Sequence, residues 1–233
     1  MKEKFNKSGN KGRGRHSPTK NMSRYKLVRR HPHRYSSVDI SPSSTTTISS
    51  TGSQTYTVGK GVDKLNIVMY GGGGGGGEAS EGTSRGNPVS EGGGGGGGSK
   101  LVIILDEVPS GTVLTFNVGA GGAKGSGNAC GADGGNTTLS YGGKDFVAGG
   151  GEGNSSGHAI PVCADDGSGG VADCDSFGDC TGTNGNNGTA KHNNSTQVGG
   201  AALGDSAGAG GRGSGDNASQ LNEAGDDGKV IIS

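Results

Sequence analysis

Residues 62–77 read VDKLNIVMYGGGGGGG, and this stretch decides what kind of fold the chain can form. In its first nine residues the apolar side chains Leu65, Ile67 and Met69 recur at every second position. Period two predicts a β-strand that is buried on one face and partly buried on the other. Seven glycines follow the strand without any intervening turn residue.

A second run of seven glycines, 92–98, ends directly before the apolar stretch KLVIIL at 100–105. The two runs enclose the polar segment EASEGTSRGNPVSE, residues 78–91. Glycine allows backbones to approach closely, as at the axis of collagen. We therefore expect ordered, extended, polyproline-II-like segments, and two flexible loops at a strand end are the alternative.

Further strands are expected on both sides of these runs. Residues 112–118, TVLTFNV, alternate with period two, and the chain closes on the short apolar run KVII at 229–232. Gly142 and Gly143 join two short runs, 137–141 and 144–148, in a typical hairpin pattern. Residues 55–58 are expected to form the first strand, and no segment has a helical period. The predicted fold is all-β, a small antiparallel β-sandwich with long glycine-rich loops, preceded by a disordered basic arm.

The composition divides the chain into two parts. Residues 1–54 are expected to form the disordered arm followed by a flexible Ser/Thr linker, and residues 55–233 a glycine-rich β domain. Within that domain, residues 154–225 form a long excursion rich in Gly, Asn and Asp.

Glycine makes up 55 of the 233 residues, and hydrophobic residues only 27%. Ordering glycine costs roughly 0.5–1 kcal/mol more than ordering alanine in regular structure. Backbone hydrogen bonds, partner subunits or cross-links must therefore hold this domain together.

The net charge of zero hides a strong asymmetry. Residues 1–35 carry a net charge of +11, so the remainder carries −11. We expect the arm to contact packaged nucleic acid or to anchor the chain to a capsid or another protein. Its twelve basic residues are Lys2, Lys4, Lys7, Lys11, Arg13, Arg15, Lys20, Arg24, Lys26, Arg29, Arg30 and Arg34.

The residues at 108–122, VPSGTVLTFNVGAGG, carry a family resemblance, together with the glycine runs and the closing GKVIIS. This pattern resembles the glycine-rich β domain of bacteriophage tail-fibre and spike proteins and of other viral surface proteins. The resemblance implies a location on the virion or at a cell surface, and no catalytic residue. It covers about residues 55–233, of which 154–225 match in composition alone.

Four cysteines, Cys130, Cys163, Cys174 and Cys180, match no zinc-binding spacing. Two disulfides are expected because the core is weak, with three possible connectivities, and free thiols are the alternative. The aspartates among these cysteines do not follow the EF-hand pattern, so we expect a solvated acidic loop and no metal site.

No cofactor or catalytic site is expected. The sequence VGAGGAKGSG at 118–127 lacks the spacing and the following helix of a phosphate-binding loop. Nothing pairs a nucleophile with a base, which argues against an enzyme. We also expect no membrane span, because no apolar stretch approaches 18 residues.

The sequence thus predicts a non-enzymatic viral structural protein. In the first hypothesis it is a virion surface, spike or tail-fibre-like component that displays a glycine-rich contact surface for host attachment. Its expected partners are other virion proteins, a host receptor and further copies in a homo-oligomer. Two alternatives stay open: a capsid protein whose arm contacts the genome, and an extracellular glycine-rich matrix or ice-binding protein.

Overall fold

The computed structural model describes residues 44–78, 92–126, 129–154, 165–175, 179–189, 199–203, 207–212 and 222–233. All of them belong to one compact unit, residues 42–233. The described residues contain strands and extended segments and no helix, so none of them forms a helix that could cross a membrane.

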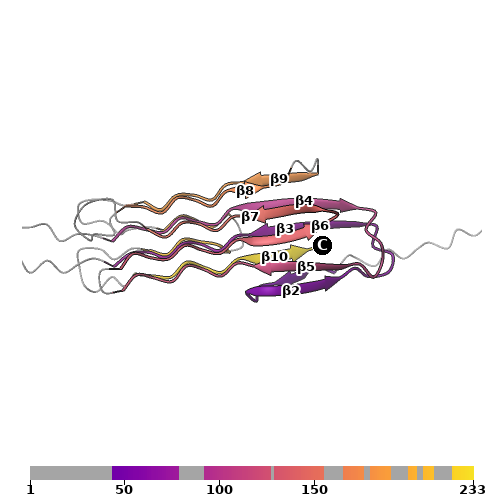
Figure 1. Cartoon of the computed structure of the whole chain (residues 1–233), viewed down its shortest axis with the longest axis horizontal. Helices are drawn as coiled ribbons and strands as arrows, with labels where there is room; N and C mark the ends of the chain where they lie inside the picture. Colours follow the sequence, from indigo (N-terminus) through magenta and orange to yellow (C-terminus); the bar gives the residue numbers. More distant parts are fainter. Residues whose placement is uncertain are drawn as a thin grey trace, which may run out of the picture. The chain divides into compact units, whose positions relative to one another are not determined.

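Within the described residues, ten strands form two five-stranded sheets in which every pairing is antiparallel (Figure 1). The first sheet has the order β1-β10-β3-β4-β9, and the second has the order β2-β5-β6-β7-β8. The strands of the first sheet are β1 (Thr46–Ile48), β3 (Lys64–Tyr70), β4 (Lys100–Asp106), β9 (Cys180–Thr183) and β10 (Lys229–Ile232). Those of the second are β2 (Gly52–Thr57), β5 (Val113–Val118), β6 (Thr137–Tyr141), β7 (Lys144–Ala148) and β8 (Ala172–Asp173).

One hydrophobic core lies between the sheets. The alternation predicted for residues 62–70 is present, because Leu65, Ile67 and Met69 are all buried on the inner face of β3. Phe116 and Phe146 meet them from the second sheet and are fully buried. This confirms the predicted all-β sandwich.

The predicted hairpin is also confirmed. Strands β6 and β7 pair from Thr137 opposite Ala148 to Tyr141 opposite Lys144. Gly142 and Gly143 between them both have positive φ angles, 60° and 74°. Glycine adopts this left-handed conformation without strain, which a two-residue hairpin turn of this type requires.

Strands are also present before residue 55, where the β domain was expected to begin. Strand β1 and the first half of β2 lie inside the expected linker, and the two strands pair with β10 and β5. Ile48 and Tyr56 pack against the core from these strands. The Ser/Thr composition hid them, because polar residues at the edge of a sheet are compatible with pairing when a few apolar side chains face inward.

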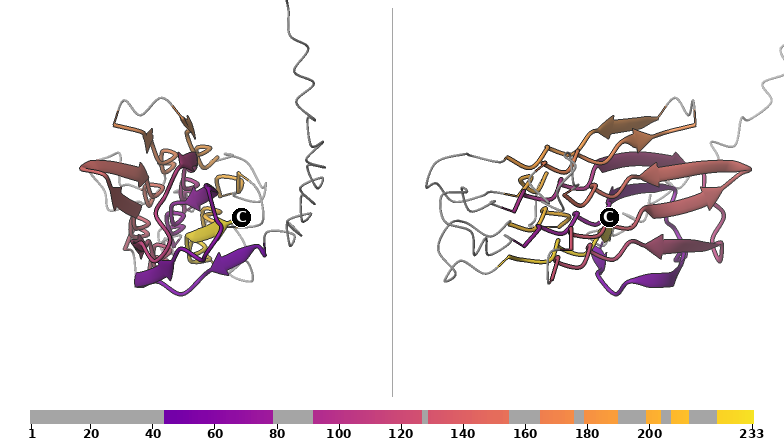
Figure 2. Two further views of the ribbon diagram at one scale, coloured as in Figure 1. Left: turned by 90° about the vertical axis from the view of Figure 1, so that its right-hand side faces the viewer. Right: turned by 60° about the vertical axis from the view of Figure 1, so that its left-hand side comes forward.

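Extended glycine-rich segments leave the strands at one end of the sandwich and return to it (Figures 1 and 2). Together they form what we call the glycine bundle. Its described segments are 71–77, 92–98, 119–125, 129–136, 149–154, 165–171, 184–189, 199–202, 207–212 and 222–228.

Candidate functional site

The run 71–77 lies at the centre of the glycine bundle, and its amides donate to three neighbouring segments in rotation, while its carbonyls accept from three others, 119–125, 149–154 and 207–212. Its first, fourth and seventh amides donate to segment 92–99, its second and fifth to 129–136, and its third and sixth to 222–228. The donor–acceptor pairs, with N···O distances of 2.8–3.0 Å, are Gly71–Ser99, Gly72–Gly135, Gly73–Asp226, Gly74–Gly96, Gly75–Ala132, Gly76–Glu223 and Gly77–Gly93. A repeat of three residues with bonds only between segments is the geometry of polyproline-II helices.

The second run of glycines, 92–98, bonds in the same way. Gly96 and Ser99 donate to segment 149–154, and Gly95 and Gly98 donate to segment 207–212. Each of these pairs is again separated by three residues. Both seven-glycine runs are therefore ordered by backbone hydrogen bonds and are not loops.

Close packing explains why glycine occupies the first five positions of the run 71–77. A Cβ atom added to any of Gly71–Gly75 would lie 1.9–2.2 Å from the carbonyl oxygen of a neighbouring segment. An ordinary carbon–oxygen contact is about 3.3 Å or longer. Because six segments surround the run, none of Gly71–Gly75 has room for a side chain.

Segments at the periphery of the bundle have room on one side. In 119–125, Gly119, Gly122 and Gly125 are buried, whereas Ala120 and Ala123 are exposed. In 165–171 the buried residues are again glycines three apart, at 167 and 170. The inner residue of each turn is glycine and the outer residue can carry a side chain.

Asparagine and aspartate side chains replace backbone acceptors at the periphery. Asn136 and Asp133 accept the amides of Gly150 and Gly153, at 2.9 and 2.8 Å. Donors and acceptors are both three residues apart, so the side chains continue the repeat of the backbone. Asn187 and Asn184 accept the amides of Gly169 and Ala172 in the same way, at 2.9 and 3.1 Å. The high Asn and Asp content thus has a structural use.

Thr137 connects the sandwich to the bundle. Its buried hydroxyl donates to the Tyr70 carbonyl at 2.7 Å and accepts the Gly119 amide at 3.0 Å. The carbonyl ends β3, and the amide begins the segment after β5. One side chain therefore satisfies two backbone groups where strands change into extended segments.

The far ends of the segments are bonded to one another. Gly77 donates to Gly93, Gly125 to Gly76, and Gly76 to Glu223. Further bonds join Gly167 to Gly94, Gly188 to Gly167, and Glu223 to Arg212. We call this end of the glycine bundle, away from the sheets, the distal end. Described residues next to the stretches 79–91, 127–128, 155–164, 190–198 and 213–221 lie at this end, and the stretches themselves lie outside the described residues.

A family model described as a glycine-rich domain matches residues 47–233. The chain belongs to this glycine-rich domain family. The match begins at residue 47, within β1, so the family domain includes β2. It does not indicate a viral origin. No curated protein matches the chain.

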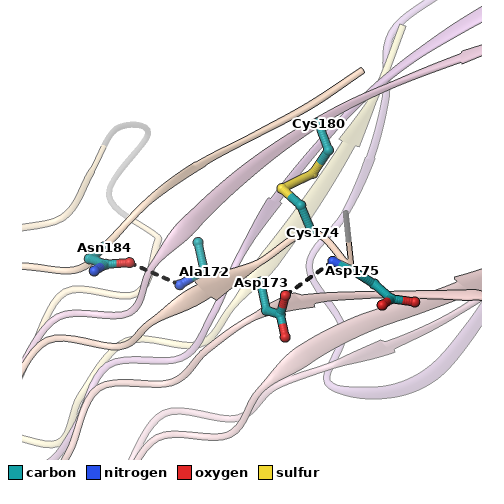
Figure 3. Close-up of a disulfide and its surroundings, with 6 residues drawn as sticks. All are labelled: Ala172, Asp173, Cys174, Asp175, Cys180 and Asn184. Carbon is teal, nitrogen blue, oxygen red and sulfur yellow. Dashed lines mark hydrogen bonds between the residues drawn. A yellow bond between two sulfur atoms is a disulfide. The ribbon is translucent and has the colours of Figure 1, made fainter. Parts of the chain in front are cut away.

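One disulfide of the glycine-rich domain joins Cys174, directly after β8, to Cys180, the first residue of β9 (Figure 3). Since β8 belongs to the second sheet and β9 to the first, this bond ties the two sheets together at one edge. Cys130 is disulfide-bonded as well, and Cys163 lies outside the described residues.

The acidic residues of the glycine-rich domain form no metal site within the described ranges, where no group of three potential ligands lies close together. Asp173 accepts the amide of Asp175 at 3.0 Å. Burial raises the pKa of Asp226, and the nearby charges of Asp227 and Glu223 raise it further. Asp227 itself accepts the amide of Gly121 at 2.8 Å.

The twelve basic residues of the arm lie outside the described residues, so their role stays a prediction. Of the sequence VGAGGAKGSG, considered for phosphate binding, residues 119–125 belong to the bundle, and no helix follows them among the described residues.

Sequence reasoning missed β8, β9 and the repeat of three in the outer segments of the glycine-rich domain. Glycines three apart, at 119, 122 and 125 or at 185 and 188, are a signal that could have revealed the repeat. It was obscured because each segment contains only two or three turns.

Proposed function

We propose that this glycine-rich domain is a display scaffold of a non-enzymatic viral structural protein at the virion surface, as in a spike or tail fibre. The observation that supports this best is the hydrogen-bonded distal end, where the flanks of five stretches are held together. A hydrogen-bonded end of this kind suits contact with a host surface.

The construction of the glycine bundle supports contact rather than catalysis. Its interior is filled by backbone, with Cβ positions on the central glycines blocked by carbonyl oxygens. Binding surfaces gain affinity when they are rigid before contact, since less conformational freedom is lost. The bundle supplies that rigidity without a large apolar core.

The basic arm supports a role in anchoring. Residues 1–35 carry a net charge of +11, and phosphate neutralisation by such a segment is independent of nucleic-acid sequence. In the alternative function this arm faces a packaged genome and the domain belongs to the capsid shell.

Immunoelectron microscopy of particles containing the chain tests the location. Antibodies raised against the purified domain, residues 42–233, should label intact particles. Labelling only after the particles are disrupted would refute surface display and favour the capsid alternative. Purified chain should also bind the cells that the particle infects, and failure to bind would refute host attachment.

A further inference from the structure

The four edge strands of the two sheets differ in how well their free edges are protected. Strands β8 and β9 form one side of the sandwich, where the disulfide connects them. They contain only two and four residues, and Asp173 and Asp179 lie in or beside them. The amide of Ala172, in β8, donates to the side chain of Asn184 at 3.1 Å. Short strands, charges and covering groups are the usual means by which proteins keep sheet edges from pairing with other chains.

Strand β2 has none of these protections. It lies on the opposite side of the sandwich together with β1, to which residues 49–51 connect it (indigo in Figure 2). Its six residues, GSQTYT, include no charged residue and no proline. Its register with β5 is continuous from Gly52 opposite Val118 to Thr57 opposite Val113, so no bulge interrupts the edge.

The outer edge of β2 exposes backbone hydrogen-bonding groups. Directly after the strand, the Val58 amide donates to the Thr112 carbonyl at 2.9 Å, on the side where β2 pairs with β5. Because the backbone groups of successive residues in a strand point to alternate sides, those of Ser53, Thr55 and Thr57 point away from β5. In the part of the chain that the structure describes, no strand pairs with this edge and no backbone hydrogen bond joins these three residues to another segment.

Apolar side chains are also incompletely covered on this side of the sandwich. Ile48 in β1 and Tyr56 in β2 pack against the hydrophobic core, but both are only partly buried. Leu114, which lies opposite Tyr56 on β5, is fully buried. A further strand beside β2 would cover Tyr56 and would also pair with the free backbone groups.

We infer that the free edge of β2 pairs with the same edge of a second copy of this chain, antiparallel about a two-fold axis at Thr55. This axis places Thr55 opposite Thr55 of the partner subunit, and Ser53 opposite Thr57 of the partner subunit. Each facing pair then exchanges both of its N–H···O=C bonds. A two-fold axis at Gln54 or Tyr56 would leave one of the three outward-facing residues opposite a residue outside the strand. The second sheets of the two copies thus form one continuous sheet.

The composition of β2 favours a second copy as the occupant of its edge. In a two-fold pair the residue at the axis faces its own kind, so a charge there would oppose a like charge, and β2 carries none. Its exposed side chains, Ser53, Thr55 and Thr57, are all hydroxyls, and facing Ser and Thr side chains stabilise neighbouring strands. Contacts of this isologous kind are the commonest in homo-oligomers.

The contact is small, so the dimer is expected to be weak and reversible. A six-residue strand is about 20 Å long, and two sheets with their side chains are about 20 Å thick, which gives about 400 Å² on each copy. This is below the size of stable interfaces, and main-chain hydrogen bonds supply most of the affinity, as in other cases of strand addition. The inference concerns assembly and does not depend on the proposed function.

Sedimentation velocity of the full chain, from micromolar to millimolar concentration, tests the pairing. A reversible dimer should form, and Thr55→Pro should weaken it about tenfold or more, because the central amide of the free edge is lost from both copies. Proline is tolerated in an edge strand where its missing N–H would face solvent, so this variant should fold. Thr55→Val, which keeps the amide, is the matched control and should leave the dimer intact. Thermal unfolding of each variant verifies that the domain is folded.

Two charged variants test the position of the axis. Thr55→Lys and Thr55→Asp should each weaken association about tenfold or more, because like charges then face each other across the axis. Mixing the two variants should restore association, since opposite charges then meet there. Failure of the mixture to associate would overturn the pairing about Thr55.

Hydrogen exchange locates the contact on the chain. The amides of Ser53, Thr55 and Thr57 should exchange rapidly in dilute solution and slowly at concentrations where the dimer forms. Those of Gln54 and Tyr56, which face β5, should be protected at both concentrations. A monomeric wild-type chain would overturn the inference, as would a Thr55→Pro variant that dimerises normally or a dimer in which the exchange of the β2 amides is unchanged.

Discussion

Replacing Gly74 by alanine should destabilise the domain far more than a typical surface change. The new Cβ would lie 2.0 Å from the carbonyl oxygen of Glu152 and 2.4 Å from its carbon. Relieving this contact requires a shift of about 1 Å or more, given ordinary carbon–oxygen distances of about 3.3 Å. Gly74 donates to Gly96 at 2.8 Å and accepts from Gly211 at 2.7 Å, and such a shift would stretch or break these bonds.

The expected loss combines two effects. Overpacking a close-packed interior costs about 1–3 kcal/mol, and a buried polar group left without a partner costs about 1–3 kcal/mol. We therefore expect the free energy of unfolding to fall by about 3 kcal/mol. In a domain of this size that lowers Tm by about 6–12 °C.

Thermal and urea unfolding of purified variants measure this effect. Gly59→Ala is the matched control, because its Cβ would meet only a Val62 methyl group at 3.8 Å, an ordinary contact. Hydrogen exchange gives a second measurement, in which the amides of 71–77 should exchange slowly because they are bonded. If Gly74→Ala costs less than about 1 kcal/mol and these amides exchange rapidly, the close packing of the bundle is refuted.

Four other predictions follow from particular contacts. Thr137→Val should lower the free energy of unfolding by about 1–3 kcal/mol, because two buried backbone groups lose their partner, whereas Thr137→Ser should be much milder; urea titration compares them. Deleting residues 229–233 removes β10 from between β1 and β3, with its buried Val230 and Ile232, so the truncated chain should show no cooperative transition in calorimetry. The pKa of Asp226 is raised in the folded state, so its charged form destabilises the fold at neutral pH, and this penalty disappears as the pH falls through the folded pKa. Asp226→Asn should therefore raise Tm at neutral pH, and by a smaller margin in acid. An equal gain in Tm at both pH values would contradict this prediction. The full chain should bind DNA or RNA with a steeper salt dependence than residues 42–233, and equal slopes in a binding titration would show that the arm does not contact phosphates.

The central strands could be predicted from sequence because their apolar residues alternate without interruption. Leu65, Ile67 and Met69 define the inner face of β3, and Gly142 with Gly143 identifies the β6–β7 turn. These are local signals, which depend on residues within one strand or one turn.

What could not be predicted depends on partners distant in sequence. Strand β1 is stabilised by pairing with β10, more than 180 residues later, and its own sequence, TTI, is too short to identify it. The segments that neighbour the glycine runs could not be predicted either. Because all residues of a run are identical, its sequence does not indicate which glycine bonds to which neighbouring segment. Asn184 and Asn187 looked like loop residues, and only the structure shows that they accept the amides of another segment.

The repeat of three limits how a bundle of this kind can change in length. Inserting one glycine into 71–77 would turn every later residue of that run by about 120° about its axis, so that each amide would face the wrong neighbour. An insertion of three would restore the orientation and move the distal end by about 9 Å. Changes in the length of such a domain are therefore expected in whole turns, and they must occur together in segments that lie side by side.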